Sequence, residues 1–145
     1  MNPNILPSDR ARVVGVIDPD VTVASAVSTG WVSMSDYGAL LCMVMVGTLG
    51  TSATVDAKIE EATDSSGTGV QDLTGKAITQ LTQAGTDSDK QAIINVFSAD
   101  LTATFTHVRL TVTVAVATSD VGAVVFGFDP RYEPGTDLTS VDEIV

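Results

Sequence analysis

Few side chains in this sequence could carry out covalent chemistry. His107 is the only histidine and Cys42 the only cysteine. A thiol or hydroxyl nucleophile needs a base beside it, and the sequence shows no G-x-S-x-G, no glycine-rich phosphate loop and no Cys/His metal spacing. Cys42 lies inside the apolar run 39–46, which predicts a buried thiol rather than a nucleophile. We therefore expect no catalytic residue, no cofactor and no enzyme.

Acidic residues occur in four close pairs, which are the remaining candidates for a metal or acid–base site: Asp18/Asp20, Glu60/Glu61, Asp87/Asp89 and Asp142/Glu143. The segment Asp87-Ser88-Asp89 could offer oxygen ligands to calcium, but it lacks the third ligand, the turn glycine and the terminal glutamate of an EF-hand loop. A solvated loop is the preferred interpretation, and no metal is predicted. A glycosidase pair built from distant carboxylates stays open at this level, although nothing favours it.

Composition excludes several classes of protein. The 145 residues include 18 acids against seven bases, for a net charge of −11, so binding to nucleic acid is not expected. A single cysteine cannot form an intrachain disulfide, which fits assembly in a reducing cytoplasm. The longest apolar run has about eight residues where a membrane helix needs about 20, and no secretory signal is visible. We expect a soluble protein without a membrane partner.

The clearest structural pattern is a strict alternation over residues 105–116. Valine or leucine occupies the even positions Val108 to Val116, and the odd positions include His107 and Arg109. A period of two predicts a strand with one apolar and one solvated face. Residues 54–61 alternate in the same way. Turn residues at 118–122 precede a third alternation at 124–128, which predicts the returning arm of a hairpin.

The same alternation of apolar and polar residues recurs along the chain and predicts an all-β protein. About eight short strands joined by turns indicate an antiparallel two-sheet β-sandwich of jelly-roll type. Residues 39–46 are apolar on both faces, so we expect a central strand covered on both sides. The expected organisation is an irregular N-terminal arm at 1–12, a sandwich domain at 13–129 and a C-terminal tail at 130–145.

Binding residues are sought among scarce bases and exposed aromatics. Arg10 and Arg12 stand out in the N-terminal arm, and Trp31, Tyr37 and Tyr132 could lie on the surface. His107 and Arg109 occupy the solvated face of their strand and are expected to meet solvent or a neighbouring subunit. The predicted interface residues are Ile5, Leu6, Arg10, Arg12, Trp31, Tyr37, His107, Arg109 and Tyr132.

Several phrases of the sequence resemble a family of small structural proteins of tailed phages and prophages, of the alphaproteobacterial siphophage type. They are WVSMSDYGALLCMVMVG, VDAKIEEATDSSGTGVQDLTGKAITQL, INVFSADL, FTHVRLTVTV and VVFGFDPRY. The resemblance implies a virion component, first among them a head decoration (cement) protein with a jelly-roll domain. Such proteins sit as homotrimers on the capsid exterior and brace subunits of the major capsid protein. No catalytic residues are implied.

Two alternatives remain at this stage. The first is a neck or tail component of the virion. The second is a carbohydrate-binding module for host attachment, although the exposed aromatics are few and a glycan partner is not expected.

Overall fold

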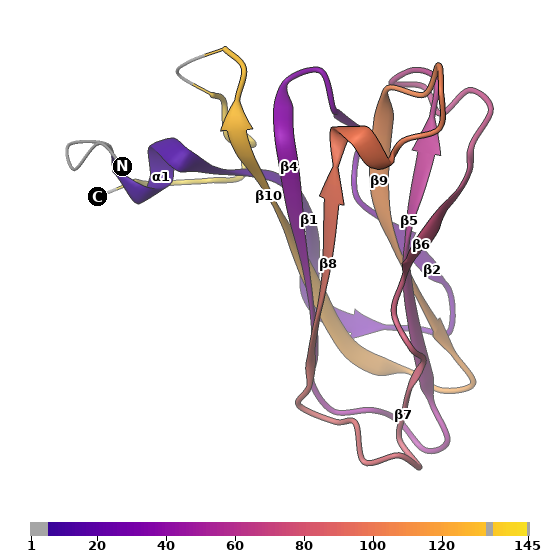
Figure 1. Ribbon diagram of the computed structural model, residues 1–145. Coiled ribbons are helices and arrows are strands. Elements are labelled where there is room, and N and C mark those ends of the chain that lie inside the picture. Colours follow the sequence, from indigo (N-terminus) through magenta and orange to yellow (C-terminus); the bar gives the residue numbers. More distant parts are fainter. Residues whose placement is uncertain (1–5, 133–134, 145) are drawn as a thin grey trace.

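The computed structural model describes residues 6–132 and 135–144, and it is almost entirely β-structure. Two antiparallel sheets lie face to face, so the fold is an all-β sandwich (Figure 1). The first sheet has the strand order β1-β10-β4-β8. The second has the order β2-β9-β5-β6, with the short strands β3 and β7 paired to β9 and β5. The predicted fold class is confirmed.

The elements have the following bounds: α1 Pro7–Arg10, β1 Ala11–Thr22, β2 Ala26–Ser28, β3 Val32–Ser33, β4 Tyr37–Val46, β5 Thr54–Ala62, β6 Gln71–Ala77, β7 Leu81–Thr82, β8 Gln91–Phe97, a 3-10 turn Ser98–Asp100, β9 His107–Ala115 and β10 Ser119–Pro130. Apart from β3 and β7, each of two residues, there are eight strands, and successive strands lie in different sheets except for β5 and β6, which are neighbours in the second sheet. Two sheets of four main strands with crossing connections form a jelly roll.

Valine-rich inner faces build the core. On β9 the even positions Val108, Leu110, Val112 and Val114 are each 1% exposed, while His107 and Arg109 lie on the outer face. On β5 the inward side chains are Val55, Ala57 and Ile59, as the alternation predicts. Burial of β-branched residues between two sheets accounts for the stability of a fold that has no disulfide.

The predicted hairpin over residues 105–128 is wrong in its pairing, although both strands exist. β9 pairs with β5, β2 and β3, whereas β10 pairs with β1 and β4. The chain therefore leaves one sheet at Ala115 and enters the other at Ser119. Val116 in this connection has a φ of 71°, a left-handed value that is unusual for a β-branched residue, and it turns the chain between the sheets.

Two further boundaries differ from the expectation. β1 runs without interruption through Asp18-Pro19-Asp20, although these residue types favour a turn, because β-bulges between Val13 and Gly15 and between Ile17 and Asp20 absorb the extra residues. At the start of the chain, Pro7–Arg10 forms one short helical turn inside the segment predicted to be irregular. Proline is favoured in the first turn of a helix, since its missing N–H is not needed there.

Candidate functional site

The structure divides the predicted interface residues into two groups on different sheets. Trp31, His107 and Arg109 lie on or beside the outer face of the six-stranded sheet. Leu6, Arg10, Arg12, Tyr37 and Tyr132 lie at one end of the four-stranded sheet, near the chain ends. Ile5 lies outside the described residues.

The first group is tied into an internal network of charges. The Arg109 guanidinium lies over the Trp31 ring, 4.6 Å from its centroid, and its Nε donates to Glu60 Oε2 at 2.8 Å. Glu60 also accepts from the Thr111 hydroxyl and lies 3.4 Å from Lys58 Nζ. Burial opposes ionisation of Glu60, but the bonds from Arg109 and Thr111 outweigh it and lower its pKa. This face is polar, and its cations Lys58 and Arg109 are both paired with carboxylates.

Trp31 is consequently not an open aromatic platform. One side of its ring carries Arg109, and Gly67 approaches so closely that a Cβ there would lie 2.9 Å from Trp31 Nε1. His107 Nδ1 lies 2.8 Å from the Thr106 hydroxyl, within the same solvated edge. A sugar ring needs a free aromatic face to stack on, so this arrangement does not favour carbohydrate binding.

The second group is organised by contacts between the two ends of the chain. Arg12, 7% exposed, donates to Asp137 Oδ2 at 2.8 Å and to Asp9 Oδ1 at 3.1 Å. Asp137 Oδ1 accepts from the Val13 N–H at 2.7 Å, and the Leu138 N–H donates to Val13 O. The hydrogen bond from Arg12 to Asp137 is the main cause of the raised pKa of Arg12. The C-terminal segment is thereby fixed along the start of β1.

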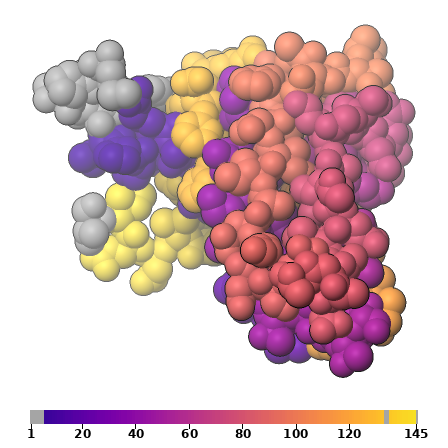
Figure 2. Space-filling model, turned by 60° about the horizontal axis from the view of Figure 1, so that its bottom comes forward, coloured from indigo at the N-terminus to yellow at the C-terminus, as the bar shows by residue number. Residues whose placement is uncertain are grey.

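These contacts hold together a lobe that projects from the sandwich. We call α1 with Leu6, together with residues 135–144, the terminal lobe. It extends from the end of the four-stranded sheet, away from the six-stranded sheet (Figure 1), and stands apart from the body of the molecule in Figure 2. Its exposed apolar side chains are Leu6, Leu138 and Ile144, and Arg10 is exposed beside them. The lobe thus combines apolar surface with the cation Arg10 and the exposed acids Asp142 and Glu143.

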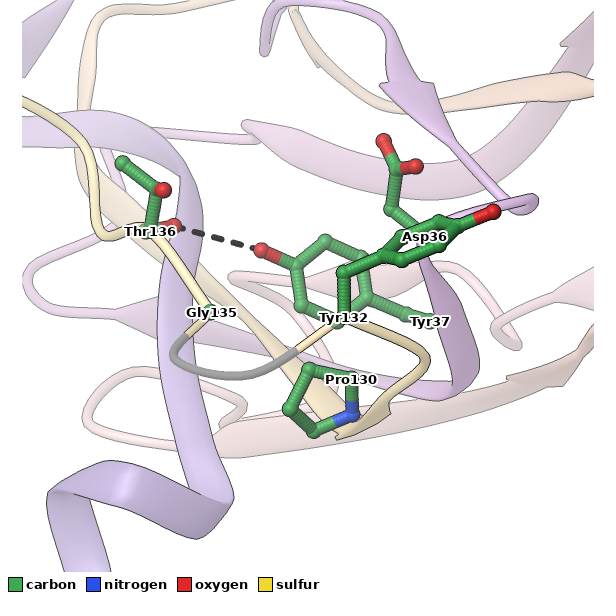
Figure 3. Close-up of a pocket in the computed structure, with 6 residues that line it drawn as sticks. All are labelled: Asp36, Tyr37, Pro130, Tyr132, Gly135 and Thr136. Carbon is green, nitrogen blue, oxygen red and sulfur yellow. Dashed lines mark hydrogen bonds between the residues drawn. The ribbon is translucent and has the colours of Figure 1, made fainter.

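A small pocket of about 220 Å³ lies at the base of the terminal lobe (Figure 3). The Tyr37 hydroxyl points to Thr136 and donates to its carbonyl at 3.2 Å. Tyr37 is 8% exposed, whereas Tyr132 on the rim is 75% exposed. Gly127 is required here, because a Cβ at this position would lie 2.6 Å from the Tyr37 ring. Tyr37 therefore serves internal packing, and Tyr132 is the aromatic residue that a partner can reach.

The outer face of the four-stranded sheet is an apolar surface that none of the predicted interface residues on the six-stranded sheet belongs to. Residues that pair across the four-stranded sheet share a face, and its outer face carries ten apolar side chains. They are Val13, Val16, Leu41, Met43, Met45, Ile93, Phe97, Val124, Phe126 and Phe128. Within the described residues, the outward positions in the paired register 11–16, 39–45, 91–97 and 122–128 carry no charge. We call this surface the apolar face.

The apolar face corrects the expectation that residues 39–46 are covered on both sides. β4 is central within its sheet, between β10 and β8, but the second sheet covers only its inner side chains Leu40, Cys42, Val44 and Val46. Met45 on the outer side is 40% exposed, and Ile93 and Phe97 beside it are 52% and 54% exposed. The apolar residues on both sides of 39–46 were the sequence signal for this surface. They were interpreted as a strand covered by a layer on each side, whereas the second sheet covers one side.

A hollow of about 240 Å³ lies in the apolar face, at the end opposite to the terminal lobe. It is lined chiefly by Pro19, Met45 and the backbone around Gly122. Gly122 leaves this space because it has no side chain, and Pro19 already lies within 2.8 Å of where a Cβ would be. Apolar hollows of this kind are typical anchor points for a partner's side chain.

The candidate chemical groups are separated by the fold. Glu60 and Glu61 are neighbours in β5 and point to opposite faces, so they cannot act as a pair. Glu61 is 0% exposed and accepts hydrogen bonds from Gln71 Nε2 and the Thr102 N–H at 2.7 and 2.8 Å.

Cys42 is 1% exposed, and burial raises its pKa to about 12. In residues 6–132 and 135–144 no group of three or more His, Cys, Asp or Glu side chains could hold a metal ion.

Comparisons with known proteins add a likeness in fold. No protein-family model matches the chain, and a search of curated proteins finds no match. Among solved structures, the chain is similar to a chain in the structure of infectious bursal disease virus Gt strain, with 12% identity, 92% of this chain covered and a TM-score of 0.44. A chain of the Gx strain structure gives 14% identity, 92% coverage and a TM-score of 0.41. The present chain spans 37% and 38% of those chains. Both TM-scores are below 0.5, and the fold assignment rests on the strand order.

Helices contribute little to the described part of the chain, and none of them is long and apolar enough to cross a membrane.

Proposed function

We propose that this chain is a structural protein of a phage virion that decorates the capsid exterior and stabilises it by linking subunits of the major capsid protein. The observation that carries the proposal is the terminal lobe, which presents Leu6, Leu138 and Arg10 at a distance from a rigid sandwich. A projecting element with exposed apolar side chains is suited to a contact with a neighbouring subunit. The phage-type phrases of the sequence supply the class of partner.

The proposed mechanism is additive burial rather than chemistry. Each copy would bury the apolar side chains of its lobe against a capsid subunit, and many weak contacts on one lattice would act together. The jelly roll would give rigidity, and the surplus of acids would keep the outer surface soluble and away from packaged DNA. A homotrimeric arrangement is implied by the resemblance alone, and the two-fold dimer proposed below is an alternative to it.

The experiment is binding of the purified protein to capsids that lack it. Leu6→Asp with Arg10→Glu changes one exposed apolar residue and one cation on the lobe. The matched control is Val23→Asp with Lys90→Glu, which makes the same substitutions at the far end of the molecule, where Val23 is 63% exposed and Lys90 is exposed. Occupancy should fall for the lobe variant and stay unchanged for the control. Equal occupancy for both would overturn the role of the lobe. Substitution is better than removal of residues 1–12, because Arg12 belongs to the buried pair with Asp137.

Electron microscopy of intact particles tests the location independently. Density for the sandwich on the head exterior supports decoration, whereas density in the neck or tail would replace it by the alternative virion role. A glycan array tests the carbohydrate-binding alternative, and we expect no binding because Arg109 occupies a face of Trp31.

A further inference from the structure

The apolar face of the four-stranded sheet is not used by the proposed capsid contact. Its ten apolar side chains come from all four strands and form one continuous surface. We propose that a second copy of this chain packs against it, face to face, to form a two-fold dimer. The four-stranded sheets of the two copies would become the central layers of a four-layer sandwich.

The size of the face is adequate for such an interface. Four strands spaced about 4.8 Å apart, over roughly eight residues at about 3.3 Å each, give roughly 500 Å² for each copy. Two copies would bury about 1,000 Å², which reaches the lower limit for a specific interface. A patch of about 500 Å² is within the range of the largest apolar patch on a typical monomer, and such patches are often functional.

A second copy matches the apolar character of the face better than a charged partner would. Its own apolar face offers only uncharged groups at the paired positions, so no charge is buried without a partner. Sheets packed in this way interdigitate aliphatic and aromatic side chains, as the inner faces of the sandwich already do. A two-fold interface also needs no second complementary surface, because the same patch serves both copies.

An antiparallel arrangement of the two copies fills the hollow. Phe128 and Gly122 lie on the same face of β10 and are equally far from its midpoint at Val125. A two-fold axis that lies between the two faces, perpendicular to β10 and level with Val125, places Phe128 of each copy over Gly122 of the other. A phenyl ring would then enter the hollow of about 240 Å³ between Pro19 and Met45. The two terminal lobes would lie at opposite ends of the dimer, where each could reach a different capsid subunit.

The test is the mass of the full-length protein in solution, measured by sedimentation equilibrium over a range of micromolar concentrations. The expected mass is twice that of the 15.0 kDa chain. Met45→Lys with Ile93→Lys, both at exposed positions of the face, should raise the dissociation constant at least ~30-fold. The control is Val70→Lys with Val116→Lys, which makes the same change of charge at residues 48% and 71% exposed elsewhere, and it should stay dimeric.

One further variant tests the register. Phe128→Ala should weaken the dimer because the hollow loses its occupant. Circular dichroism checks that each variant is folded.

A monomer, a trimer, or a dimer that the Met45→Lys/Ile93→Lys variant leaves intact would overturn the proposal. A dimer weakened by that variant but not by Phe128→Ala would overturn the antiparallel register. None of these outcomes bears on capsid binding by the terminal lobe, which is tested separately.

Discussion

Arg12 and Asp137 are 125 residues apart in the sequence and are joined by a 2.8 Å ion pair in which the two side chains are only 8% and 15% exposed. The pair connects the first residues of β1 to the C-terminal segment. It therefore determines where the terminal lobe stands relative to the sandwich.

Loss of Asp137 should detach the C-terminal segment. Asp137→Ala removes the ion pair and the bond from the Val13 N–H, and it leaves a buried guanidinium with only the partly exposed Asp9 as partner. We expect the free energy of unfolding to fall by about 3 kcal/mol in urea titrations, as for other buried pairs that lose one member. Proteolysis after residue 130 should become faster. The control Asp142→Ala changes an exposed acid of the same segment and should have no effect.

Gly127→Ala should disturb the base of the lobe from the opposite side. The new Cβ would lie 2.6 Å from Tyr37 Cδ1, so the ring must move and its hydroxyl loses Thr136. We expect a loss of about 2 kcal/mol in the free energy of unfolding, which is typical of overpacking. Gly30→Ala serves as the control, since a Cβ there meets nothing within 4 Å. Similar stabilities for the two variants would contradict the close packing of Tyr37 on Gly127.

Glu61 should make stability depend on pH. Burial tends to raise its pKa, but the hydrogen bonds from Thr102 and Gln71 prevail, and the pKa of Glu61 in the folded protein is lowered from 4.5. A group with a lowered folded pKa stabilises the fold above its unfolded pKa, and this contribution is lost as the pH falls through the folded value. In the Glu61→Gln variant, the side-chain amide nitrogen would face one of the two hydrogen-bond donors, Gln71 Nε2 or the Thr102 N–H, and it cannot accept a hydrogen bond from it.

The measurement is urea unfolding of Glu61→Gln and of the unsubstituted protein. We expect the variant to be about 2 kcal/mol less stable at about pH 7, and the difference to shrink at about pH 3. Glu143→Gln, at an exposed position, should match the unsubstituted protein at both values. A difference that is independent of pH would mean that the charge of Glu61 contributes nothing.

Cys42 should be inert in the folded protein. With a pKa of about 12, only ~10⁻⁴ of the thiols are ionised at about pH 8, and the side chain is 1% exposed. Ellman's reagent should react at the rate of unfolding in buffer and at once in urea. Rapid reaction without denaturant would contradict the packing of β4 against the second sheet.

The sequence predicted the inward and outward positions of β5 and β9 correctly, since a strand that borders a core must alternate. It also predicted the burial of Cys42 and the sandwich class. The sequence did not predict which strands pair with one another. Residues 105–128 have the pattern of a hairpin, yet β9 and β10 belong to different sheets, because pairing depends on the whole strand order and not on turn residues at 118–122.

The sequence by itself determined which side chains are apolar and how they alternate, because local backbone geometry imposes a period of two on every strand. Only the tertiary structure decided what covers each face. The second sheet covers the inner side of β4 and leaves Met43 and Met45 outward, where the same apolar pattern becomes a surface. Likewise Arg12 and Tyr37, which were predicted to lie on the surface, are buried by a C-terminal segment more than 90 residues away in the sequence. A local sequence pattern cannot predict a contact between residues that far apart.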